Sequence, residues 1–190
     1  MVTGVGTPRS RSVAFLFACI LCAGGCATLA PRPERMAAVP VDGAQAFAAP
    51  PLAGAVTTGA VIGAEDYVVG GGRLSVKGEE MRGAVRLSLQ RAGYLAPDHD
   101  RARFILDVAV IWLEPPTQLP LDLTGTATTL TRYRLSRRED GTIVFDDLIA
   151  MPCTMSGVDA FRRAVECAVG HNIGALLHAL REATGPARRP

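Results

Sequence analysis

Alternating apolar and polar residues predict strands in the second half of the chain. From Arg103 to Leu113 apolar side chains take every second position and, near the end, both sets of positions, which is typical of a central strand. A Thr-rich run over 121–135 and an apolar run over 142–151 flank Asp140-Gly141, a dipeptide typical of hairpin turns. The pattern therefore predicts three consecutive antiparallel strands.

Two segments show the spacing of three and four residues that is typical of an amphipathic helix. The first covers 78–92, and Gly93 ends it. The second runs from about 157 to 184, where Gly170 and Gly174 are expected to weaken its middle. Its apolar stripe includes Phe161, Val165, Leu176 and Leu180.

The order of these elements, with short strands before the first helix, predicts an α+β domain over residues 58–185. We expect an antiparallel sheet of about four strands with two helices packed on one face. The other sheet face should be solvated and rich in Thr and Arg. Residues 186–190 form a short polar tail.

The N-terminal 25 residues have the features of a secretory signal. Arg9 and Arg11 precede a run of about ten apolar residues, and small residues then lead to Cys26. Ala23-Gly-Gly-Cys26 resembles the lipobox of bacterial lipoproteins. That resemblance implies removal of residues 1–25 and a diacylglycerol thioether on Cys26. The alternatives are a plain signal peptide or an uncleaved membrane anchor.

Residues 26–57 are expected to connect this lipidated cysteine to the domain. Five of the 13 prolines and many alanines lie in 27–57, a composition with little to bury, which predicts an extended or disordered tether. Ala27, in the place where Asp marks inner-membrane retention in enteric bacteria, resembles the outer-membrane class. We expect a protein anchored on the periplasmic side, with the outer membrane favoured over the inner.

Charge and composition exclude some classes of partner. The chain has 20 basic and 18 acidic side chains, a formal net charge of +2. Removing 1–25 takes Arg9 and Arg11 and leaves 18 of each sign. A neutral domain lacks the basic surface of a nucleic-acid-binding protein.

Two other cysteines, Cys153 and Cys167, remain after processing. In an oxidising compartment they form either a disulfide or two separate buried thiols, and the sequence leaves both open. His171 lies one helical turn after Cys167, but no third group is evident that would orient a Cys–His nucleophile. His171 and His178 share a helix face but are seven residues apart, whereas metal ligands on one helix prefer a spacing of three or four, so we interpret them as two solvated histidines. We expect no enzyme activity, cofactor or metal.

Three further features have structural interpretations. Asn172 lies near the apolar stripe of the last helix and should bond a neighbouring backbone group. Trp112 is interpreted as the edge of the core, with a partner contact as the alternative. Gly70-Gly-Gly72 lacks the spacing of a phosphate loop and is interpreted as a turn.

The second half of the chain resembles a proteobacterial group of small α/β-sandwich envelope lipoproteins. The resemblance covers about 78–183 and is carried by Leu121-Asp-Leu-Thr124, Tyr133-Arg-Leu135, Gly141 with Phe145, Ala164-Val-Glu166, Ala168 and Asn172-Ile173. The architecture is similar to auxiliary lipoproteins of lipopolysaccharide assembly and of lipid-transporting ABC systems. It implies an accessory subunit of an envelope protein complex, or alternatively a binding module for a lipid or other apolar ligand.

Cys26→Ala tests the lipid anchor. Because the thiol is the site of alkylation, we expect the substitution to abolish labelling by a clickable fatty acid and to release the protein from membranes. Labelling that persists in the variant contradicts the assignment of Cys26.

Overall fold

The computed structural model describes residues 30–38, 51–69, 72–114, 124–157 and 159–184. The predicted signal segment, Cys26 and the polar tail lie outside these residues. Within them, no helix is both long and apolar enough to cross a membrane.

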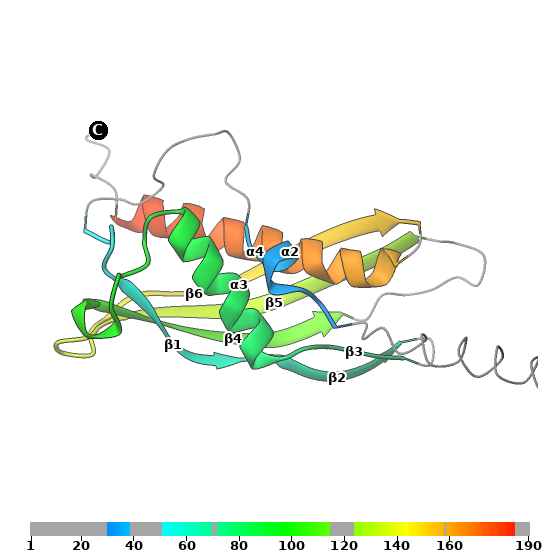
Figure 1. Cartoon of the computed structure of the whole chain (residues 1–190), viewed down its shortest axis with the longest axis horizontal. Coiled ribbons are helices and arrows are strands. Elements are labelled where there is room, and N and C mark those ends of the chain that lie inside the picture. Colours follow the sequence, from blue (N-terminus) through cyan, green and yellow to red (C-terminus); the bar gives the residue numbers. More distant parts are fainter. Residues whose placement is uncertain (1–29, 39–50, 70–71, 115–123, 158, 185–190) are drawn as a thin grey trace, which may run out of the picture.

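A four-stranded sheet forms the centre of the domain (Figure 1). Its strands, in the order β1-β4-β5-β6, are β1 Val56–Ile62, β4 Phe104–Glu114, β5 Thr124–Arg137 and β6 Ile143–Ser156. The three last strands pair antiparallel, and β4 is an inner strand, as predicted.

The expectation of a wholly antiparallel sheet is wrong for β1, which runs parallel to β4. A helix, α3 Gly78–Arg91, lies between the two strands in the chain and returns it to the same end of the sheet, as a parallel pair requires. Between β1 and α3, β2 Ala64–Val69 and β3 Gly72–Val76 pair antiparallel as a separate hairpin, with Val69 opposite Gly72. Gly70 and Gly71, on which the interpretation as a turn depends, lie outside the described residues.

The two long helices pack on one face of the sheet, as predicted (Figure 1). α4 Ala160–Thr184 contacts β5 and β6, while α3 contacts β1. Val165, Leu176 and Leu180 are fully buried. Phe161 is only partly buried: it packs on Gly125, where an added Cβ would lie 2.9 Å from its ring. The stripe is therefore correct except at this end.

Asn172 ties α4 to the sheet in the middle of the core. Its Oδ1 accepts a hydrogen bond from the Tyr133 hydroxyl at 2.8 Å. Its Nδ2 donates to the carbonyls of Ile149 at 2.7 Å and Thr129 at 3.2 Å. Burial raises the pKa of Tyr133, so the hydroxyl keeps its proton and can donate. The expectation that Asn172 bonds backbone groups is confirmed, and those groups belong to two strands.

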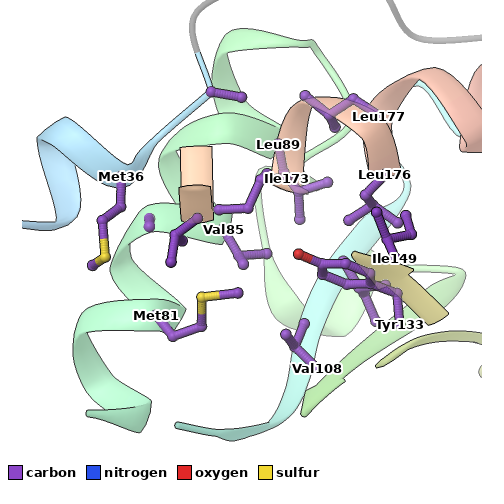
Figure 2. Packing of buried hydrophobic residues seen from close by; sticks show 14 of the residues in the cluster. Met36, Met81, Val85, Leu89, Val108, Tyr133, Ile149, Ile173, Leu176 and Leu177 are labelled. Atoms are coloured by element: carbon purple, nitrogen blue, oxygen red, sulfur yellow. The ribbon is translucent and has the colours of Figure 1, made fainter. Parts of the chain in front are cut away.

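The expected tether is wrong for the described residues on both sides of 39–50. Leu52 and Ala55 are buried before β1 begins, so the domain starts before residue 58. Upstream, residues 30–38, here called the strap, contain a short helix, α2 Pro33–Met36. Met36 is fully buried and points into the same cluster as Met81 and Val85 of α3 (Figure 2).

Glycines of the two long helices make room for the strap. A Cβ at Gly83 of α3 would lie 3.0 Å from the Pro33 side chain, and one at Gly170 of α4 would lie 3.3 Å from the Met36 carbonyl oxygen. Gly170 lowers intrinsic helix propensity, but it also lets the strap backbone approach α4. The composition of 27–57 gives no sign of this docking, because a single Met and a few alanines are enough to fill the groove that the two helices leave.

Three polar contacts hold the strap in register. The backbone N–H of Arg32 donates to Glu166 Oε1 at 3.0 Å, and Arg35 Nη1 lies 3.8 Å from Glu166 Oε2. At the other end, the N–H of Ala38 donates to Ser88 Oγ at 2.9 Å. Glu166 is 3% exposed, so the strap supplies the donors that a buried carboxylate needs.

Met36→Ala distinguishes a docked strap from a free tether. Truncating a fully buried Met leaves a cavity, so we expect the free energy of unfolding to fall by about 2–4 kcal/mol. Glu34→Ala, at an exposed position of the same short helix, is the control and should change it by less than about 0.5 kcal/mol. Urea denaturation measures both, and equal stability of the two variants contradicts docking.

Candidate docking surface on the open sheet face

The sheet face opposite the helices carries apolar side chains that no described element covers. Five large apolar side chains are markedly exposed in the described residues, and four of them are Ile62, Ile111, Trp112 and Leu148. Trp112 is 44% and Leu148 55% exposed. The expectation of a face rich in Thr and Arg is therefore incomplete.

Strand register gathers these residues into one area. Ile62 of β1 pairs with Ala109 of β4, which pairs with Arg132 of β5, and Arg132 pairs with Leu148 of β6. In the neighbouring row, Trp112 pairs with Leu130, and Leu130 with Ala150. Residues in register share a face of a sheet, and Thr129 and Thr131, on either side of Leu130, are buried on the helix side.

A β-bulge adds a further apolar side chain to the open face. The register of β4 against β5 shifts between Val110 and Trp112, so Ile111 is the extra residue. A bulge places two residues opposite one on the partner strand. Ile111 and Trp112 are both exposed, whereas Val110 and Leu113 beside them are buried. We call Ile62, Ile111, Trp112, Leu130 and Leu148 the apolar patch.

A cluster of charges borders the apolar patch. Asp146 accepts two hydrogen bonds of 2.8 Å from Arg132, at Nε and Nη2, and one of 3.2 Å from Arg134. The hydrogen bond from Arg132 lowers the pKa of Asp146. On β4, Asp107 accepts from the N–H of Ala60 at 2.7 Å. A shallow depression of about 230 Å³ lies between this cluster and Ile62.

The cysteine pair lies on the covered side of the domain. Cys153 of β6 and Cys167 of α4 form a disulfide in the structure, with their Cα atoms 5.9 Å apart. The nearer ring nitrogen of His171 is 3.8 Å from Cys167 Sγ. These three residues are the one group of potential metal ligands found among the described residues. The disulfide leaves both sulfurs neutral, without the negative charge with which thiolates bind a metal.

The other candidate functional residues from the sequence do not come together in one site. His178 lies 3.6 Å from Glu182 on the exposed side of α4, and Asp140 bonds Arg137 within the hairpin turn. Asp146 and Asp147 alternate along β6, so Asp147 lies on the helix side. Trp112 is exposed and not at the edge of the core, which fits the alternative of a partner contact.

The sequence does not predict that the residues of the apolar patch lie together on an exposed face. The signal was present in β4, where apolar residues occupy both sets of alternate positions near Ile111 and Trp112. That pattern is also typical of a strand buried on both faces, so the alternation alone predicts a central strand. Only the tertiary structure shows that the second face is uncovered, because Ile111 and Trp112 are exposed there.

Comparisons with known proteins assign no family. No family model matches the sequence, and no curated protein matches it. A structure from Caulobacter crescentus described as a candidate lipoprotein is 15% identical, covers 67% of this chain and 88% of its own, and has a TM-score of 0.49. A Xanthomonas campestris protein of the DUF330 family is 14% identical, covers 67% and 81%, and has a TM-score of 0.48. These values are too low to transfer a function.

Mass spectrometry under non-reducing conditions tests the disulfide. We expect no alkylatable thiol at Cys153 or Cys167 in the processed protein. The bond closes a loop with a sequence separation of 14, so the double variant Cys153→Ser/Cys167→Ser should lose about 3 kcal/mol of unfolding free energy. Two free thiols after oxidising preparation contradict the bond.

Proposed function

We propose that this chain is a non-enzymatic lipoprotein of the cell envelope, anchored through Cys26, which serves as an accessory subunit by binding another protein through its open sheet face. The supporting observation is that four of the five markedly exposed large apolar side chains in the described residues belong to the apolar patch on that face. Contiguous exposed apolar area is a mark of interaction sites.

The size of the face suits a protein partner. Four strands spaced about 4.8 Å apart and about ten residues long give roughly 600 Å². A matching partner surface brings the total buried area to about 1,200 Å², the lower end for specific protein complexes. Trp and Arg are enriched at the centres of such interfaces, and Trp112 and Arg132 lie on this face.

The chemistry of the face also favours a protein over a lipid acyl chain. Acyl chains bind in concave apolar sites, whereas the apolar patch lies across a sheet and beside the ion pairs of Asp146. A protein surface with an apolar centre and charges of both signs complements it, because Arg132 and Asp146 each retain exposed polar surface. Lipid binding is therefore the second candidate and an outcome of the test.

Photo-crosslinking in native envelopes tests the docking surface. A photoreactive side chain replaces Leu148 within the apolar patch or Ile143 outside it. Both residues lie on β6 and are similarly exposed, 55% and 51%. Ile143 pairs with Ser136 at the hairpin end of the same face, so it is a matched control for a position away from the apolar patch. We expect a discrete protein adduct at Leu148 and none at Ile143.

Substitutions at Trp112 and Ile143 test whether the crosslinked protein binds through the apolar patch. Trp112→Asp should weaken recovery of that same protein by about tenfold or more, as for an aromatic at the centre of an interface, with an unchanged circular dichroism spectrum. Ile143→Asp should leave recovery unchanged. Phospholipid adducts at Leu148 support the lipid-binding candidate instead, and equal adducts at both positions contradict both.

A further inference from the structure

The strap changes how far the domain can move from its anchor. A free tether over residues 27–57 would allow a separation on the order of 100 Å, at about 3.5 Å per residue. In the structure, residues 30–38 are part of the folded domain. Only residues 27–29 separate Cys26 from the strap, and four residue steps span at most about 14 Å.

We propose that the strap holds the domain directly against a phospholipid bilayer, with the side that carries Ala30 and Arg32 facing the headgroups. This inference rests on the proposed lipid anchor at Cys26. The partner of this surface is the membrane itself, and any protein that binds the open sheet face must do so next to the bilayer.

The strap stays docked because undocking would break several stabilising contacts at once. Undocking exposes Met36 and leaves Glu166 without the Arg32 N–H and the Arg35 side chain. A buried carboxylate that loses its donors is strongly disfavoured. Undocking also breaks the hydrogen bond that the Ala38 N–H donates to Ser88 Oγ. The strap is therefore a fixed part of the fold and not a flexible tether.

Lipid photo-crosslinking of the full-length protein measures the placement. The lipidated protein is reconstituted into phosphatidylethanolamine–phosphatidylglycerol vesicles with a photoreactive side chain at Arg32 or Glu139. The Arg32 side chain can be replaced because its backbone N–H makes the contact to Glu166. Glu139 lies in the exposed turn between β5 and β6. We expect phospholipid adducts at Arg32 and none at Glu139.

An insertion variant is the decisive control. Twenty Gly and Ser residues placed between Leu29 and Ala30 leave the lipid anchor and the strap contacts intact but restore a long tether. We expect the phospholipid adduct at Arg32 to be lost while the protein still floats with the vesicles.

The outcomes distinguish failure of the lipid anchor at Cys26 from failure of the proposed placement of the strap at the membrane. Protein that carries no lipid and does not float overturns the anchor at Cys26 and the placement with it. Protein that is lipidated and floats, but has no adduct at Arg32 or an equal adduct with the insertion, overturns the placement alone and leaves the anchor standing.

Discussion

Coverage of one sheet face by helices is the constraint on which the rest of this structure depends. α3 and α4 both pack on the same side of the four strands, and their apolar stripes fill that side. Burial of apolar surface is the main stabilising contribution in a fold of this size. Since both helices lie on one side, the apolar side chains of the opposite face stay exposed and add nothing to the stability of the domain unless a partner covers them.

A few polar groups determine how the layers fit together. An apolar stripe on α4 could slide along the sheet at little cost, but Asn172 bonds Tyr133, Ile149 and Thr129 in one arrangement only. Buried polar groups without partners are penalised, so any other register of α4 is disfavoured. Glu166 has the same role between α4 and the strap. Specific geometry here comes from buried hydrogen bonds, while most of the stability comes from the apolar cluster.

The two proposed interaction surfaces lie in different layers of the domain. The strap lies on the helix layer, and the apolar patch lies on the open face of the sheet. With the proposed lipid anchor at Cys26, the strap would fix the distance to the membrane and leave the apolar patch free to bind a protein. This arrangement is suited to a subunit that works at the surface of a membrane and not at a distance from it.

The sequence by itself determined the two long helices, the three consecutive strands and the fold class. Asp140-Gly141 located the hairpin, the alternation around Val108 located the central strand, and the helical stripes placed α3 and α4, because these signals depend on neighbours in the chain. Tertiary structure alone decided the rest. The parallel pairing of β1, the groove at Gly83 and Gly170, and the apolar patch each depend on segments distant in sequence. Met36 shows the reason most clearly: one apolar residue in a Pro- and Ala-rich segment carries no periodic signal, and only the space left between two helices determines that it is buried.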